Sequence, residues 1–193
     1  MDLIPTISQT NALGAPGGGR ITLVIAPHAG MPVMVETAAR LALNGRVRVL
    51  DCGNRFNVYP VAQAVRRITP RLEETLSHIT LSRAFTCYQV LTLLEETAAQ
   101  PVAALVLDLL STFLDENVTF AESRRLLQLG IGHLQRVSVA APVVVSVKPL
   151  LALSAERQPL LEMLKEAAGD TLQFEAPRPQ PSAALPLCPD GAI

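Results

Sequence analysis

The stretch that decides the fold is RITLVIAPHAGMPVMVETAARLAL, Arg20 to Leu43. Ile21 to Ala26 is an uninterrupted apolar run, which is typical of a strand buried on both faces of a parallel sheet. Pro32 suits the first turn of a helix, and apolar residues then recur at helical spacing until Asn44 and Gly45 end it. A strand, a tight turn and a helix in this order are also where many proteins hold a nucleotide phosphate.

The same strand and helix unit recurs along the chain. Further strands are expected at 46–51, near 79–81, and at 102–108, 142–147 and 171–175, with helices at 58–68, 85–99, 119–136 and 155–168. This alternation predicts an α/β fold, a three-layer αβα arrangement with a mostly parallel sheet flanked by helices. We expect one domain at 20–175, between a flexible lead-in at 1–19 and a Pro-rich tail at 176–193.

Composition narrows the class of protein. The chain has 193 residues, of which 49% are hydrophobic, enough for one sizeable core. A net charge of −1 and 4% aromatic residues give no general attraction to nucleic acid or acidic lipid. Three cysteines without a CxxC pair suggest neither a disulfide framework nor a zinc site. No leader or membrane-spanning run is evident, so a cytoplasmic protein without a membrane partner is expected.

The turn after the first strand is a poor phosphate cradle. A phosphate loop uses several glycines, a lysine and a hydroxyl, whereas this turn offers only Gly30. The chain's two lysines, Lys148 and Lys165, lie far downstream, and Pro27 and Pro32 remove two N–H donors. The amino end of the helix and His28 could still attract an anion weakly.

Asp51 and Asp108 each follow an apolar strand, where a carboxylate could hold a metal-bound water over a nucleotide. The interpretation we favour for both is an aspartate that caps a neighbouring loop. The three histidines, His28, His78 and His133, are too scattered to predict a metal site or a catalytic triad. The residues are therefore not those of a hydrolytic centre.

Five segments together resemble the ATPase core of the RecA-type recombinases, most closely the RadA-like branch. They are GGGRITLVIAPHAG, VLDCGNRF, HITLSRAFTCYQVLTLLEE, LVLDLLSTFLDE and VSVAAPVVVSVK, between Gly17 and Lys148. The third is the most specific, with Arg83, Ala84, Phe85 and Gln89 in the family's pattern. The resemblance implies a RecA-like P-loop NTPase core with Asp108 in the metal-associated position of the Walker B strand.

Departures from that family fall on its catalytic residues. The phosphate loop lacks its lysine and hydroxyl, Gly53 and Asn54 stand where the family has a catalytic glutamate, and Lys148 replaces a usual glutamine. The segment PLLALSAERQ, 149–158, is short and apolar where the family has a glycine-rich DNA-binding loop. The resemblance thus implies a vestigial nucleotide site, formed by Pro27, His28, Ala29, Gly30, Met31 and Asp108, with no catalytic residue and no ATP or magnesium cofactor.

Three hypotheses follow. The first is a non-catalytic RecA/RadA-like paralogue that acts through protein contacts, as an accessory factor in DNA recombination or repair. The second is a regulatory binder similar to the bacterial cell-division inhibitors that keep a RecA-like fold without a phosphate loop. The third is a DNA-dependent ATPase that binds nucleotide through its backbone, Asp108 and a residue such as Lys148 from a neighbouring subunit. A protein partner or a homo-oligomer is expected, and DNA is a weaker alternative.

Overall fold

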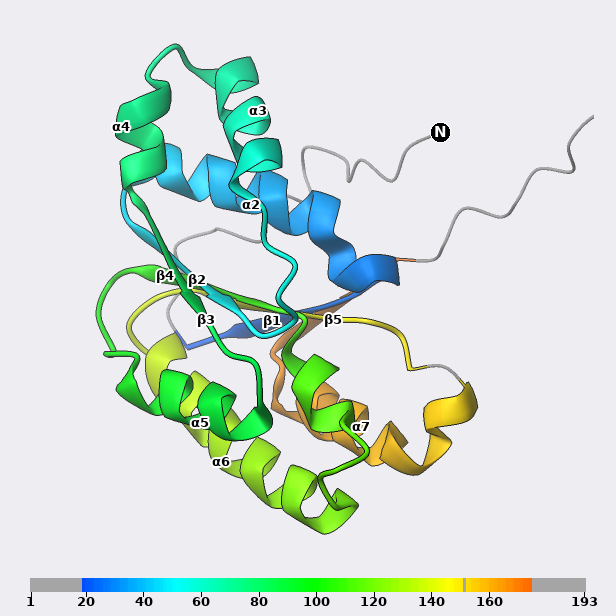
Figure 1. The fold of residues 1–193 in the computed structure, drawn as a ribbon. Coiled ribbons are helices and arrows are strands. Elements are labelled where there is room, and N and C mark those ends of the chain that lie inside the picture. Colours follow the sequence, from blue (N-terminus) through cyan, green and yellow to red (C-terminus); the bar gives the residue numbers. More distant parts are fainter. Residues whose placement is uncertain (1–18, 151, 175–193) are drawn as a thin grey trace, which may run out of the picture.

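A six-stranded parallel sheet forms the centre of the molecule (Figure 1). The structure is a computed structural model and describes residues 19–150 and 152–174. The strands are β1 (Ile21–Ile25), β2 (Val47–Asp51), β3 (Ile79–Arg83), β4 (Ala103–Leu107), β5 (Val143–Val147) and β6 (Asp170–Gln173), in the spatial order β3-β2-β4-β5-β1-β6. Since all of these strands are parallel, their carboxyl ends meet at one edge of the sheet.

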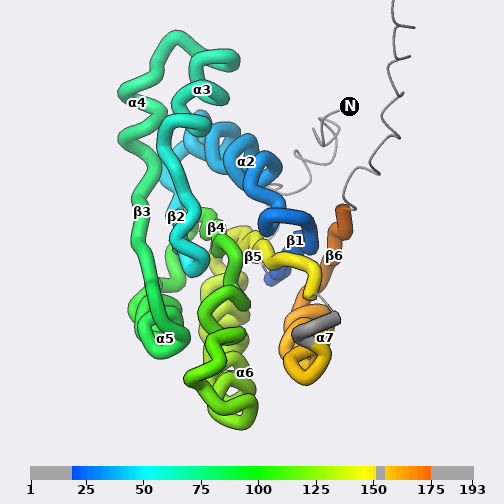
Figure 2. Tube along the Cα trace, turned by 45° about the vertical axis from the view of Figure 1, so that its right-hand side comes forward, coloured from blue at the N-terminus to red at the C-terminus, as the bar shows by residue number. Residues whose placement is uncertain are grey.

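Helices cover both faces of the sheet, so the predicted three-layer αβα fold is confirmed (Figures 1 and 2). One face carries α2 (Met31–Asn44), α3 (Val58–Ile68) and α4 (Leu72–Ser77), and the other carries α5 (Cys87–Glu96), α6 (Phe120–Ser138) and α7 (Gln158–Ala167). Short 3-10 segments follow β1, β4 and β5, at η1 (Pro27–Gly30), η2 (Leu109–Leu114) and η3 (Ala152–Arg157). Each helical layer packs on its own cluster of buried apolar residues.

The central strands β4 and β5 form where the sequence is almost continuously apolar, because both faces of the sheet are covered there. Every residue of β5 is buried, as are the last four of β4. Helix starts are fixed by side chains: Thr119 accepts a hydrogen bond from the Glu122 backbone N–H at 3.3 Å, which confirms that predicted helix start. At the start of α5, Thr86 accepts from the Gln89 backbone N–H at 3.2 Å.

Several boundaries differ from prediction. The helix predicted for 85–99 spans only Cys87–Glu96, because Thr86 is its cap and Phe85 lies outside it, 62% exposed. The helix predicted for 155–168 begins at Gln158, because the preceding residues form η3. Helix α4 was not predicted, since Leu72–Ser77 is short and mostly polar.

Apart from Gly19, the predicted lead-in at 1–19 and tail at 176–193 lie outside the described residues, so that division stays a prediction. Within the described part, none of the helices combines the length and the apolar character needed to cross a bilayer.

Candidate functional site

The carboxyl edge of the sheet contains a point where the chain leaves in opposite directions. After β2 it passes to the helical layer of α3, whereas after the neighbouring β4 it passes through η2 to α6 (Figure 1). In open α/β sheets ligands bind in the crevice at such a point. Asp51 is the last residue of β2 and Asp108 directly follows β4, so the structure brings the two predicted carboxylates to this place.

Gly53 brings the loop after β2 directly against Asp108. A Cβ atom added at Gly53 would lie 2.6 Å from Asp108 Cβ and 2.8 Å from its Oδ2. Contacts this short are not tolerated between real side chains. Only glycine lets the loop approach so closely, so this part of the crevice is filled by the chain's own atoms.

The Asp51 carboxylate caps the loop that follows it, as predicted. Its Oδ1 accepts the backbone N–H of Arg55 at 3.1 Å, and its Oδ2 accepts that of Phe56 at 2.9 Å. The Arg83 guanidinium adds an ion pair, Nε to Oδ2 at 3.2 Å, and donates to the Phe56 carbonyl at 2.6 Å. Asp51 is fully buried, and these two N–H groups and the Arg83 guanidinium account for its charge and its oxygens.

The Asp108 carboxylate does not cap a loop, which corrects the interpretation favoured from the sequence. It is 1% exposed and lies beneath Lys148, whose Nζ is 2.6 Å from Oδ2, while Arg55 Nε lies 3.7 Å from the same oxygen. No described group makes a hydrogen bond of good angle to Oδ2, so charge attraction holds this pair. The backbone N–H of Asp108 donates to Ser146 Oγ of β5 at 3.1 Å. Lys148 therefore reaches Asp108 within one chain.

The turn after β1 is packed against the sheet. Ala29 and Gly30 are buried, and the Met31 N–H donates to the His28 carbonyl inside the turn. His28, Ala29 and Gly30 have φ values of 53°, 54° and 60°, a left-handed run of a kind that L-residues seldom adopt. A Cβ at Gly30 would lie 3.1 Å from Val24 Cγ1, so the turn rests directly on β1.

Cys52 directly follows Asp51 in the sequence, and the residue is 1% exposed. Burial, and then the negative charges of Asp51 and Asp108, raise the pKa of this thiol far above its ordinary value. Cys52 is therefore a neutral, apolar part of the core at physiological pH, and Cys87 is also a buried free cysteine.

The three histidines are not brought together. His78 Nδ1 lies 2.7 Å from the Ala42 carbonyl, which ties the end of α4 to α2, and His28 is exposed at the turn after β1. No group of three potential ligands that could hold a metal ion occurs in residues 19–150 and 152–174.

The family-like residues Arg83 and Gln89 both have local structural roles. Arg83 pairs with Asp51, and Gln89 Oε1 accepts the Phe85 backbone N–H at 2.8 Å, next to the Thr86 cap of α5. Sequence reasoning singled out neither Arg55 nor the contact between Gly53 and Asp108. The only signal for Gly53 was a glycine two residues after a strand end, which indicates a close backbone approach.

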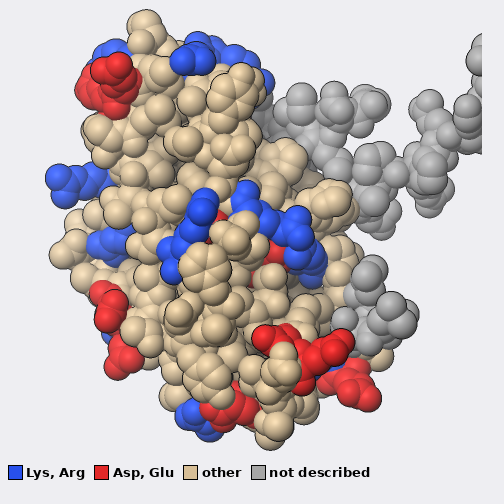
Figure 3. All heavy atoms as spheres, viewed as in Figure 1, with Lys and Arg blue, Asp and Glu red and all other residues tan. Residues whose placement is uncertain are grey.

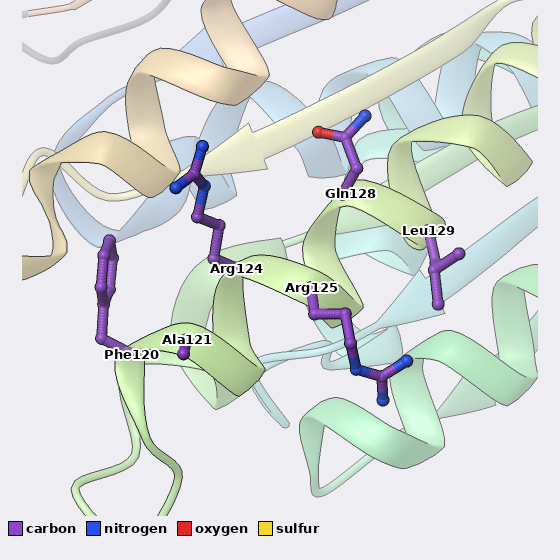
Figure 4. A pocket seen from close by; sticks show the side chains of 6 residues that line it. All are labelled: Phe120, Ala121, Arg124, Arg125, Gln128 and Leu129. Carbon is purple, nitrogen blue, oxygen red and sulfur yellow. The ribbon is translucent and has the colours of Figure 1, made fainter.

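A second concave surface lies on the outer side of α6. It is a groove of about 520 Å³ lined by Phe120, Ala121, Arg124, Arg125, Gln128 and Leu129 (Figure 4). Arg125 is paired with Glu122 at 2.8 Å, and Leu129 is 46% exposed. All six lining residues belong to one helix and none is an acid or a nucleophile, so this groove offers no catalytic chemistry.

The comparisons with known proteins assign the chain to no family. No protein-family model matches the chain, and no curated protein matches it. The resemblance to RecA/RadA proteins therefore depends on the five segments of sequence alone.

Proposed function

We propose that this chain is a non-catalytic RecA/RadA-like paralogue that acts through protein contacts, as an accessory factor in DNA recombination or repair. One observation carries the proposal: Lys148 of the same chain lies on the Asp108 carboxylate at 2.6 Å, where a metal-associated aspartate would need a free oxygen. The turn at Ala29 and Gly30 adds to it, because it is packed against β1 and lacks the lysine and the hydroxyl that a phosphate loop uses.

Exposed apolar side chains on β3 and just after it support action through protein contacts. β3 is an edge strand of the described sheet, and Leu81 on it is 40% exposed. Phe85 and Tyr88, which follow β3, are 62% and 51% exposed. An open strand edge with exposed apolar side chains is a surface on which another polypeptide can pair and pack.

Nucleotide titration tests the non-catalytic half of the proposal. We expect no heat of binding from Mg-ATP in calorimetry and no phosphate release, with or without DNA. A dissociation constant in the micromolar range corresponds to about −8 kcal/mol and would be readily detected. Binding at that level, or hydrolysis abolished by Asp108→Asn, would overturn the proposal in favour of an ATPase.

Affinity capture from native extract tests the biological half. Recombination or repair proteins are the expected partners, with a Leu81→Asp/Phe85→Asp double variant as the control that should lose them. Recovery of cell-division proteins instead would favour the regulatory binder similar to division inhibitors.

A further inference from the structure

Three cations stand above the two buried carboxylates at the carboxyl edge of the sheet. We call Arg55, Arg83 and Lys148 the cationic rim; their side chains are 49%, 40% and 35% exposed. The carboxylates beneath them, Asp51 and Asp108, are 0% and 2% exposed. Figure 3 shows blue atoms gathered at the centre of this face, with little red visible between them. The surface that a partner meets here is therefore positive.

The rim keeps hydrogen-bond donors for a ligand. Among the described residues, the only ion pair of the Arg55 guanidinium is the 3.7 Å approach of Nε to Asp108 Oδ2, which is too long for a hydrogen bond. Arg83 uses Nε and Nη2 within the protein, so its Nη1 has no acceptor among those residues. The Asp51 carboxylate and the Phe56 carbonyl hold the Arg83 guanidinium in place, so little of its side-chain entropy is lost when it binds a carboxylate.

Two exposed rings lie next to the rim in the chain. Phe85 comes two residues after Arg83 and is 62% exposed, and Tyr59, in the first turn of α3, is 61% exposed. Large exposed apolar side chains beside fixed arginines are typical of protein interaction sites.

We propose that the cationic rim binds a short acidic peptide segment of a partner protein, with carboxylates on Arg55 and Arg83 and an apolar side chain against Phe85. This inference rests on the proposed function, because it names the chemistry of the partner in a chain that acts through protein contacts. It places the contact at the switch point of the sheet, beside the open edge of β3.

The charge balance favours a peptide over nucleic acid. The two carboxylates below the three cations leave a single formal positive charge, and Figure 3 shows acidic side chains on the lower part of the same face. A long polyanion would meet these acids, whereas a short segment can stay on the rim. The chain as a whole carries a net charge of −1.

Fluorescence anisotropy of the full chain with a short labelled peptide of alternating glutamate and leucine tests the proposal. We expect saturable binding at low salt that weakens about tenfold in Arg55→Gln, because one charge-assisted hydrogen bond is lost. Arg124→Gln is the matched control: it removes an exposed arginine of α6 and should leave binding unchanged. Arg55→Gln should fold normally, because the contact that fixes the loop is made by the Arg55 backbone.

Variants of the probe make the result independent of protein stability. A peptide with glutamine for glutamate should not bind, and one with alanine for leucine should bind more weakly. Absence of binding, or equal loss in Arg55→Gln and Arg124→Gln, would overturn the proposal, as would displacement of the peptide by a lower concentration of single-stranded oligonucleotide. Mg-ATP is titrated separately: a positive result there contradicts the proposed function, whereas loss of the peptide signal alone contradicts only this inference.

Discussion

The turn after β1 and the crevice between β2 and β4 lie on the same edge of the sheet but are closed by different forces. The turn is closed by packing, with Ala29 and Gly30 buried against β1. The crevice keeps both aspartates and is closed by charge, with Arg83 on Asp51 and Lys148 on Asp108. An ion pair is broken when one of its two partners is replaced, whereas a turn packed against a strand depends on several contacts at once. The two regions should therefore respond differently to mutation.

The close contact at Gly53 should give the largest effect. We expect Gly53→Ala to lower the free energy of unfolding by about 2 to 3 kcal/mol, since the new Cβ would lie 2.6 Å from Asp108 Cβ. Gly132→Ala is the control, because nothing lies within 4 Å of its Cβ position and it sits within α6. That variant should gain about 0.5 to 1 kcal/mol. Equal stability of the two variants in urea unfolding would show that the loop does not rest on Asp108.

Loss of the lysine over Asp108 should have the next largest effect. Lys148→Met leaves a buried carboxylate for which Arg55, at 3.7 Å, is the only paired cation among the described residues. We expect a loss of about 2 kcal/mol, less than for a fully buried pair because the lysine is partly exposed. The double variant Lys148→Met/Asp108→Asn should recover most of this lost stability, because it also removes the uncompensated carboxylate, and a double-mutant cycle measures the difference.

The same variant separates the two regions. If charge alone blocked the site, Lys148→Met would bind Mg-ATP. The packed turn after β1 predicts that it does not, because the turn still lacks the lysine and the hydroxyl of a phosphate loop. Calorimetric binding by Lys148→Met would mean that the turn can open, and that the comparison between the two regions is wrong.

The sequence predicted the sheet well because both of its faces are covered. Runs such as 102–108 and 142–147 are almost entirely apolar and too short for a typical helix, so they are readily predicted as buried strands. Because the strands are parallel, the carboxyl ends of these strands lie at the same edge of the sheet. It could not predict that Lys148 lies on Asp108, since that contact depends on β4 and β5 being neighbours. The spatial order of the strands in a sheet cannot be predicted from the local periodicity of the sequence.

The conformation of the turn was also beyond sequence reasoning. Histidine and alanine rarely adopt a left-handed backbone, so only Gly30 pointed to an unusual turn. Tertiary packing of Ala29 overrides that preference. The sequence did predict that the turn lacks the residues of a phosphate cradle, which depends on side-chain types rather than on conformation.

The crevice should also respond to alkaline pH. The pKa of the Cys52 thiol is raised in the folded protein above its ordinary value of 9.0, so the folded state keeps a proton that the unfolded state loses. The contribution of this thiol to the free energy of unfolding is therefore fully present well below pH 9. It falls as the pH rises above about 9, by about 1.4 kcal/mol per pH unit. Between pH 8 and pH 10, we expect the free energy of unfolding to fall by about 1 kcal/mol less in Cys52→Ala than in the wild-type protein, as measured by urea unfolding at each pH. Parallel curves for the two proteins would show that the thiol ionises freely in the folded state.

The smallest effect should come from the turn after β1. His28 is exposed and has φ of 53°, so His28→Gly should relieve a left-handed backbone without loss of packing. We expect a gain of about 0.5 to 1 kcal/mol in thermal unfolding, since glycine adopts this conformation freely but costs some chain entropy. His28→Ala removes the imidazole and keeps the Cβ, so it should stay within about 0.5 kcal/mol of wild type. A loss in His28→Gly would mean that the imidazole itself holds the turn, and that this region, like the crevice, depends on a polar side chain.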